Sequence, residues 1–263
     1  MSSSAPAAVP LNPPRWRSGV LDPVLLLAVL LLAWQAVASW TSGVAVAPPL
    51  PTMAYLVGLV GTAGFWGHAG ATGAAFLASF GISAAIGLAL GLLLGLRRFA
   101  ADVIEPVLAG FYTIPKVTLY PVVLLVFGLG APAKVAFGVM HGLVPITLFT
   151  LGAVRSLPPV LLRTTRVLRL TPWQAAWSVL VPACLPAVVD GLRVGFALSL
   201  LGVLIGEMFA SQQGLGFLLV SGLAQHNIRL ATAVVVVIVT GAVFANLLIR
   251  HLGRLVTRSG MGA

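Results

Sequence analysis

Long apolar runs separated by short polar segments dominate the chain. Each run is close to the length of about 20 residues that a helix needs to cross the hydrocarbon core of a bilayer. The pattern predicts six transmembrane helices, at about Leu21–Trp40, Gly70–Leu96, Val103–Phe127, Lys134–Val154, Ala187–Phe209 and Leu230–Leu252. We therefore expect an all-α, polytopic integral membrane protein whose transmembrane domain covers residues 21–254.

The segments outside these runs have simpler predictions. Residues 1–20 are rich in Ala, Pro and Ser and predict a disordered tail, and residues 255–263 form a second short tail. The Pro-rich stretch Pro48–Pro51 predicts an outer loop. The apolar segment Thr52–Val60 that follows is too short to cross a bilayer, so we expect it at the interface.

Composition and charge support a membrane protein. Hydrophobic residues make up 59% and charged residues 8% of the chain, against about 45–50% and about 25% in soluble domains. The net charge is +10, and the basic residues lie between the apolar runs, as the positive-inside rule describes. They do not form a basic stripe of the kind that binds nucleic acid. We expect both termini in the cytoplasm, because 11 of the 15 basic residues then lie inside: Arg15, Arg17, Arg97, Arg98, Arg155, Arg163, Arg166, Arg169, Arg250, Arg254 and Arg258.

The longest inner segment, residues 155–186, carries helix signals. Pro159–Arg169 lacks glycine and internal proline, which favours a helix. A second helix is predicted to start at Thr171 and to run to about Val181, where Pro182 interrupts it. Its start has an N-cap Thr171, Pro172 at the first helical position and Gln174 reaching back to the cap. The hairpin is either a connector or a docking element for a cytoplasmic partner.

Of the ionisable residues within or near the predicted spans, two are candidates for the translocation path. Lys116 lies between Pro115 and Pro121, which are expected to kink or break the third span, as Pro145 is in the fourth. Lys116 either attracts an anionic solute in a cavity or extends to the inner surface. Glu207 near the outer end of the fifth span either serves the path or a gate, or caps the outer loop.

Two further patterns favour structural roles. Asp190 and Arg193 are three residues apart on one helix, which predicts an ion pair. Gly87, Gly91 and Gly95 form overlapping Gly-x3-Gly units that allow close helix approach. We expect packing within the bundle, the alternative being a contact between two copies of the chain.

Catalytic and metal-binding motifs are absent from the sequence. It holds no Gly-rich phosphate loop of the Gly-x4-Gly-Lys-Ser/Thr type and no paired carboxylates with catalytic surroundings. Cys184 is the single cysteine and the four histidines are scattered, so no metal site is predicted. We expect no cofactor and no enzymatic activity in this chain, so the energy for transport must come from elsewhere.

Several stretches, in order and spacing, carry a family resemblance. They are Pro48 to Pro51, Ile114-Pro115-Lys116 followed by Phe127-Gly128-Leu129-Gly130, Val179-Leu180-Val181-Pro182, and Glu207-Met208-Phe209-Ala210 followed by Gly214-Leu215-Gly216. Over about Pro48–Arg254 they resemble the inner-membrane permeases of bacterial ABC importers, most closely the branch for sulfonates, taurine, nitrate and bicarbonate. Val179–Pro182 matches the Ile-x-Leu-Pro end of that family's cytoplasmic signature.

The resemblance implies a type I ABC importer permease fold in a bacterial inner membrane. It also implies partners: two copies of an ATPase subunit, an extracytoplasmic solute-binding protein and a second permease copy, identical or different. Residues of the inner loop would then couple the chain to the ATPase, namely Arg163, Thr164, Thr165, Arg169, Thr171, Pro172, Trp173, Gln174, Val181 and Pro182.

The start of this loop departs from the family signature. Arg163-Thr164-Thr165 stands where Glu-Ala-Ala is expected, and Arg169 stands where Gly is expected. Either the partner ATPase carries compensating acidic residues or the coupling is altered. We predict that Arg163→Glu combined with Arg169→Gly changes ATPase coupling more than membrane insertion.

The expected function is translocation of a small solute, such as a sulfonate, taurine or nitrate, driven by ATP that a partner hydrolyses. The alternative is an ion- or proton-coupled secondary transporter of a small solute. That class would require internal inverted repeats and more charged groups at the bilayer centre, where Lys116 and Glu207 are the candidates.

Overall fold

The computed structural model describes residues 21–259, with side chains placed for residues 24–161, 163–171, 173–251 and 253. Every element in that range is helical, as the apolar pattern predicted. The first elements are α1 (Leu21–Trp40), α2 (Pro49–Val60), α3 (Ala63–Gly95), α4 (Arg98–Thr113), the 3₁₀ turn η1 (Lys116–Leu119), α5 (Tyr120–Phe127) and α6 (Ala131–Arg155). The remaining elements are α7 (Pro159–Val167), α8 (Pro172–Ala175), the π-helical turn η2 (Ala176–Leu180), α9 (Val181–Ala210), α10 (Leu215–Ala224) and α11 (Ile228–Ser259).

Within the described residues, four helical stretches are long and apolar enough to cross a membrane: α3, α6, the continuous helix Trp173–Ala210 and the stretch Ile228–His251 of α11. A fifth span is counted if α4 and the η1–α5 segment are taken together. The predicted tail of residues 1–20 lies outside the described residues. The predicted tail of residues 255–263 lies outside them only from residue 260, because α11 continues to Ser259.

The third span breaks at Pro115, as its prolines predicted. Its two halves, Arg98–Thr113 and Lys116–Phe127, meet at an angle of 89°. Ile114, which precedes Pro115, has the extended angles φ −66° and ψ 132°, because the proline ring excludes the helical conformation from the residue before it. Pro121 lies in the first turn of α5 and Pro145 lies inside an uninterrupted α6, so the break falls at Pro115.

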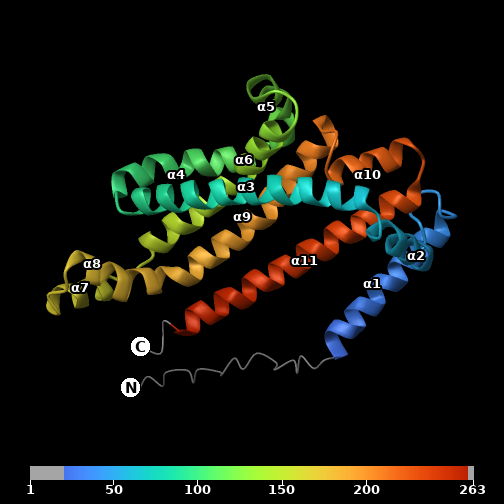
Figure 1. Cartoon of the computed structure of the whole chain (residues 1–263). Coiled ribbons are helices and arrows are strands. Elements are labelled where there is room, and N and C mark those ends of the chain that lie inside the picture. The colour runs from blue at the N-terminus through green and yellow to red at the C-terminus, as the bar shows by residue number, and fades with distance from the viewer. Residues whose placement is uncertain (1–20, 260–263) are drawn as a thin grey trace, which may run out of the picture.

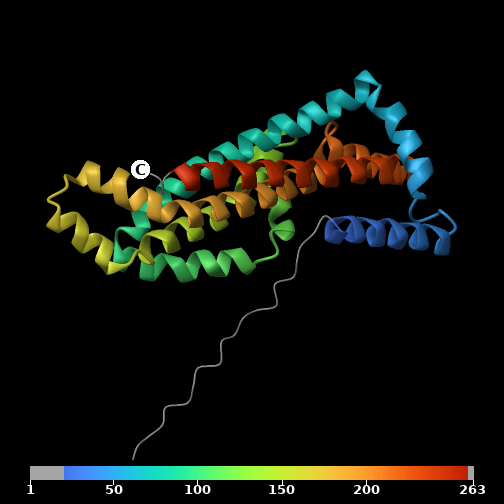
Figure 2. The same cartoon turned by 90° about the horizontal axis from the view of Figure 1, so that it is seen from below.

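Helix α1 coincides with the first predicted span but lies apart from the bundle in both views (Figures 1 and 2). Its stretch Val24–Trp40 counts among the shorter apolar helices, as does α2. The indole Nε1 of Trp34 donates to the carbonyl oxygen of Ala47 at 2.9 Å and holds the two helices in place. Leu25 and Leu32 are 66% and 70% exposed, so this helix presents an apolar surface suited to lipid.

Helix α6 is the centre of the bundle and packs between α3 and α9. Figure 1 shows these three helices running side by side or crossing at small separation. Small residues permit that separation. A Cβ atom at Gly138 would overlap Ser79 of α3 and Val203 of α9, and the Ser79 hydroxyl donates to the carbonyl oxygen of Val135 at 3.0 Å. Such contacts are typical of helix association in lipid.

The glycines of the Gly-x3-Gly units face α6 within the same chain. Cβ atoms at Gly87, Gly91 and Gly95 would lie 2.9, 2.5 and 2.7 Å from the Cβ atoms of Ile146, Thr150 and Val154. The preferred interpretation, packing within the bundle, is confirmed. The alternative, a contact between two copies through these glycines, is wrong because α6 occupies that face.

Candidate functional site

A buried ion pair lies near the end of the bundle where α9 meets α10. The ammonium Nζ of Lys134 on α6 lies 3.1 Å from Oε1 of Glu207 on α9, and their side chains are 5% and 0% exposed. Both side chains lie in the transmembrane part of the chain, where a lone charge is very unfavourable. The pair therefore forms only because each charge compensates the other.

The second carboxylate oxygen of Glu207 is also fully occupied. Oε2 accepts a hydrogen bond from the hydroxyl of Thr72 at 2.8 Å and another from the amide of Gly216 at 3.1 Å. Thr72 in turn accepts from the amide of Leu215 at 2.7 Å. Glu207 thus ties α3, α6 and α9 to the first turn of α10, whose unpaired amides favour a negative charge.

The turn before α10 is shaped around this carboxylate. Gly214 has φ +125°, a conformation that L side chains rarely adopt, and a Cβ atom there would overlap the Glu207 carboxylate. Its amide donates to Nδ1 of His68 on α3 at 3.1 Å. The stretch Gly214-Leu215-Gly216 therefore closes over Glu207, and a role of this residue in a path or gate stays a prediction.

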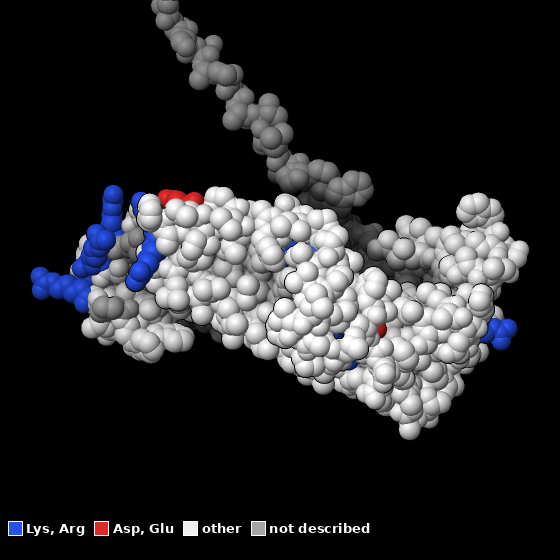
Figure 3. Space-filling model, turned by 90° about the horizontal axis from the view of Figure 1, so that it is seen from above, with Lys and Arg blue, Asp and Glu red and all other residues white. Residues whose placement is uncertain are grey.

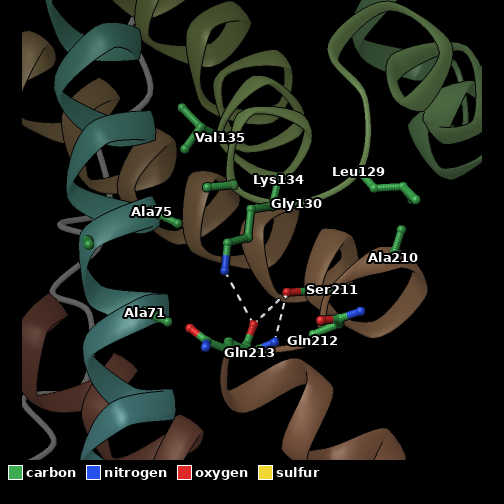
Figure 4. A pocket seen from close by; sticks show the side chains of 12 residues that line it. Ala71, Ala75, Leu129, Gly130, Lys134, Val135, Ala210, Ser211, Gln212 and Gln213 are labelled. Carbon is green, nitrogen blue, oxygen red and sulfur yellow. Dashed lines mark hydrogen bonds between the residues drawn. The ribbon is translucent and has the colours of Figure 1, made fainter.

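A cavity of about 830 Å³ adjoins the pair and is lined by Lys134 but not by Glu207 (Figure 4). Its lining residues are Ala71, Ala74, Ala75, Leu129, Gly130, Ala131, Lys134, Val135, Ala210, Ser211, Gln212 and Gln213. Figure 4 shows the Lys134 side chain pointing toward Gln213, to whose carbonyl oxygen Nζ donates at 3.3 Å. The volume lies in the range of about 300–1,000 Å³ that is usual for small-molecule pockets.

Lys116, the other candidate of the translocation path, lies at the break of the third span and is 8% exposed. Its Nζ donates to the carbonyl oxygen of Tyr112 at 3.3 Å and lies 4.9 Å from the centroid of the Tyr112 ring. Lys116 and Glu207 thus have different partners. A path through both stays a prediction.

The hairpin α7–α8 at the opposite end is formed largely as predicted. Helix α7 ends in a Schellman motif: the amide of Leu170 donates to Thr165 and that of Arg169 to Arg166. Arg169 has φ +49°. The turn that the family signature assigns to glycine is therefore kept by an arginine in the left-handed region, which is unfavourable for L residues.

The predicted capping box at the start of α8 is confirmed. The amide of Gln174 donates to Oγ1 of Thr171 at 3.3 Å, and the amide of Thr171 donates to Oε1 of Gln174 at 3.0 Å. Trp173 follows Pro172 in the first turn, is 72% exposed and contacts the ring of Trp177 edge to face. The hairpin therefore presents a rigid, partly aromatic surface.

The prediction that Pro182 interrupts this helix is wrong. The stretch Trp173–Ala210 is continuous, with the π-helical turn Ala176–Leu180 directly before Val181 and Pro182. Proline normally clashes with the carbonyl four residues earlier, here Ser178. The wider π turn removes that contact and lets the chain pass from the hairpin into the membrane without a break.

Lys and Arg side chains gather at one end of the molecule in Figure 3, the end where Figure 1 labels α7 and α8. Arg163, Arg166 and Arg169 are exposed, and no salt bridge within the described residues involves them. Arg155 by contrast bridges Asp102 and Glu105 of α4, at 2.7 Å each. The sequence has no acidic residue between Glu105 and Asp190, so the hairpin is uniformly basic.

Thr164, Thr165 and Val181 complete the predicted coupling residues. Thr164 is exposed and donates to the carbonyl oxygen of Val160 at 3.0 Å, whereas Thr165 is 8% exposed and Val181 is 42% exposed. The predicted Asp190–Arg193 pair is confirmed at 3.4 Å, and Nε of Arg193 also donates to Asn246 of α11 at 3.3 Å.

Sequence reasoning missed Lys134 as the partner of Glu207, and it missed α10 and the cavity. A signal was present: Lys134 and Glu207 stand at the outer ends of consecutive predicted spans, where a lone buried charge calls for an opposite one. The hydrogen bonds that Thr72 and His68 make had no signal in the sequence, because they depend on how α3 packs against the turn before α10 and its first residues.

Comparisons with known proteins agree on one family. Residues 81–258 match the family described as "Binding-protein-dependent transport system inner membrane component". A probable ABC transporter permease protein of Haemophilus influenzae is 28% identical, over 84% of this chain and 90% of its own length. The taurine transport system permease protein TauC of Escherichia coli is 26% identical, over 85% and 86%.

A riboflavin transport system permease protein, RibX of Chloroflexus aurantiacus, is 34% identical over 75% of this chain and 74% of its own length. Among solved structures, an inward-facing conformation of the MetNI methionine ABC transporter has a TM-score of 0.58 at 22% identity. It covers 79% of this chain and 97% of that chain. This likeness supports the fold. The names of the relatives point to several different solutes.

Proposed function

The chain belongs to the binding-protein-dependent transport system inner membrane components and is an ABC importer permease subunit for a small solute; we propose that the solute is an anion such as a sulfonate, taurine or nitrate. ATP is hydrolysed in a separate partner subunit, because this sequence has no phosphate-binding loop. An extracytoplasmic binding protein delivers the solute, and a second permease copy completes the path.

The hairpin α7–α8 faces the cytoplasm in this proposal, and both termini lie on the same side. The support is the concentration of exposed arginines at that end (Figure 3), since cytoplasmic loops carry an excess of Lys and Arg. The far ends of α3, α6, α9 and α11 then face the outside. The cavity beside Lys134 consequently opens toward the side from which solute arrives.

The proposal that the hairpin α7–α8 binds the ATPase is supported mainly by its exposed surface and its fixed shape. The Schellman motif after α7 and the capping box before α8 fix its shape, and Trp173 offers a large exposed ring. Exposed aromatic and arginine side chains are the residues that dominate protein interfaces. Because Arg163, Arg166 and Arg169 have no acidic neighbour in the loop, the matching groove of the ATPase is acidic.

The candidates of the translocation path fit this scheme in different ways. Lys116 lies at the break of the third span, where irregular backbone is tolerated when it lines a cavity or is buried in protein. Glu207 is fully buried and bound by Lys134, Thr72 and Gly216. It serves the path indirectly, by fixing Lys134 at the edge of the cavity.

Affinity purification of the tagged chain from mildly solubilised native membranes tests the proposal. We expect recovery of an ATPase with a phosphate-binding loop and, after crosslinking, of an extracytoplasmic binding protein. A matched variant, Arg163→Glu with Arg166→Glu, should reach the membrane at the same level but recover less ATPase. Recovery of the chain alone, even after crosslinking, would contradict the proposal and favour a secondary transporter.

A further inference from the structure

The cavity beside Lys134 has two unlike walls (Figure 4). Ala71, Ala74 and Ala75 on α3 form an apolar wall of small side chains. Ser211, Gln212 and Gln213 form a polar wall in the turn between α9 and α10, and the two glutamines are exposed. A molecule in this cavity therefore meets methyl groups on one side and amide groups on the other.

Lys134 contributes the charge of the cavity. It is the one ionisable side chain among the residues that line it. An ammonium has three protons to donate. One is directed to Glu207 at 3.1 Å and one to the carbonyl oxygen of Gln213 at 3.3 Å, so the third remains for a ligand. The lysine is 4% exposed and held from two sides, so its position does not depend on the ligand.

Glu207 is hidden from the cavity by its own bonds. Its exposed fraction is 0%, and its oxygens are taken by Lys134, Thr72 and the amide of Gly216. A cation that enters the cavity meets the ammonium but not the carboxylate. An anion meets the ammonium directly, in surroundings where charge interactions are stronger than in water.

We propose that this cavity binds a small organic oxyanion, with Nζ of Lys134 and the side-chain amides of Gln212 and Gln213 donating to the oxyanion group. The short apolar part of the ligand lies against the alanine wall of α3. The volume of about 830 Å³ admits such a molecule together with water. This site rests on the proposed function, since it gives the transported solute a binding position on the permease itself.

Charged thiol reagents of similar size test the sign of the field in the cavity. Cysteine is placed at Gln212 in the full-length chain, with Cys184, the natural cysteine, replaced by alanine. The rate of modification by the anionic sulfonatoethyl methanethiosulfonate is divided by the rate for its cationic trimethylammonioethyl counterpart. The same ratio at Gly64→Cys, where a Cβ atom meets nothing within 4 Å, is the reference.

We expect the ratio at residue 212 to exceed the reference by roughly threefold to tenfold at low salt, with the excess reduced by screening at high salt. Lys134→Arg should keep the excess. The double variant Lys134→Met with Glu207→Gln removes both charges and should abolish it. In the protein with cysteine at residue 212 and Lys134 unchanged, millimolar ethanesulfonate should slow the modification. The neutral ethyl methyl sulfone should not slow it.

A ratio equal to the reference in the Lys134 protein would overturn the site, as would equal protection by the sulfonate and the sulfone. Protection is measured with Lys134 intact, so the test holds even if the double variant does not fold. Failure here together with recovery of an ATPase would refute only the cavity. An anion preference without any ATPase would refute the proposed importer instead.

Discussion

The two ends of the helical bundle handle charge in opposite ways. In the proposed orientation the outer end holds Lys134 and Glu207, and the inner end is that of the hairpin α7–α8. Lys134 and Glu207 are 5% and 0% exposed, and they bond to each other and to Thr72, Gln213 and Gly216. At the inner end Arg163, Arg166 and Arg169 are exposed and form no salt bridge within the described residues. Burial holds the first set in place through neighbouring protein groups, whereas solvation leaves the second set free for a partner.

Removing one charge from the outer pair gives the largest effect in this comparison. Lys134→Met leaves the Glu207 carboxylate buried without its counter-ion, and we expect a loss of about 3–5 kcal/mol in the free energy of unfolding. Lys134→Met combined with Glu207→Gln should recover most of that loss. Thermal unfolding of the purified chain in mild detergent measures both variants.

Arg155→Met at the inner end is the matched control. Its pairs with Asp102 and Glu105, at 2.7 Å each, are shorter than the Lys134–Glu207 pair at 3.1 Å, but the three side chains are 35%, 59% and 45% exposed. We expect a change of about 1 kcal/mol or less. An equal loss in Lys134→Met and Arg155→Met would refute the distinction between the two ends.

The outer end also depends on a backbone that only glycine adopts readily. Gly214→Ala places a side chain at φ +125° and against the Glu207 carboxylate. We expect a loss of about 2–3 kcal/mol, since strained backbone of this kind costs about 1–3 kcal/mol, with the clash in addition. Thermal unfolding again measures the variant.

Gly128→Ala separates the two contributions. Gly128 has φ +74°, but a Cβ atom there meets nothing within 4 Å. This variant should lose only the conformational part, about 1–2 kcal/mol. If Gly214→Ala is no worse than Gly128→Ala, then the turn does not close tightly over Glu207.

The structure of the inner end could be predicted from the sequence better than that of the outer end. At the inner end the signals are local: the Thr171–Gln174 capping box and helix α7 were predicted and are present. At the outer end the site depends on contacts between residues far apart in the chain, such as Lys134 with Glu207 and Thr72 with Leu215. Apolar periodicity places each helix in the membrane but does not say which faces meet.

Of two local signals at prolines, one was confirmed and one was misjudged. Pro115 was expected to kink or break a span, and the 89° turn shows a complete change of direction. Pro182 was expected to end a helix, but the π turn Ala176–Leu180 accommodates it. A proline removes one hydrogen bond in either case. Whether the chain bends or widens depends on the neighbouring helices, which no short window of sequence describes.

The arginines of the hairpin should affect partner binding more than membrane insertion. Arg163→Glu with Arg169→Gly lowers the charge of the hairpin by three, and we expect ATPase recovery to fall by roughly tenfold at low salt, about 1.4 kcal/mol. Membrane insertion should stay unchanged. Stimulation of ATP hydrolysis in the co-purified complex, measured against salt concentration, checks the coupling.

Arg229→Glu at the outer end is the control for charge alone, because Arg229 is exposed near the start of α11, far along the chain from the hairpin. It should leave ATPase recovery unchanged. Equal losses in the two variants would mean that total charge, and not the hairpin, governs association.

The smallest effect is expected at Arg169, where the backbone conformation favours glycine but a partner would favour the charge. Its φ of +49° costs about 1–2 kcal/mol for an L residue, and glycine loses about 0.4–1 kcal/mol through its freer unfolded chain. Arg169→Gly alone should therefore raise the free energy of unfolding by about 0.5–1 kcal/mol.

Arg166→Gly is the control, because it removes the same charge from inside α7. It should lower the free energy of unfolding by about 1 kcal/mol. Opposite shifts in the thermal midpoints of the two variants would show that glycine is more stable than arginine at position 169. That result is expected if the charge of Arg169 is needed to bind a partner. Shifts of the same sign would mean that the turn does not hold Arg169 in the left-handed conformation.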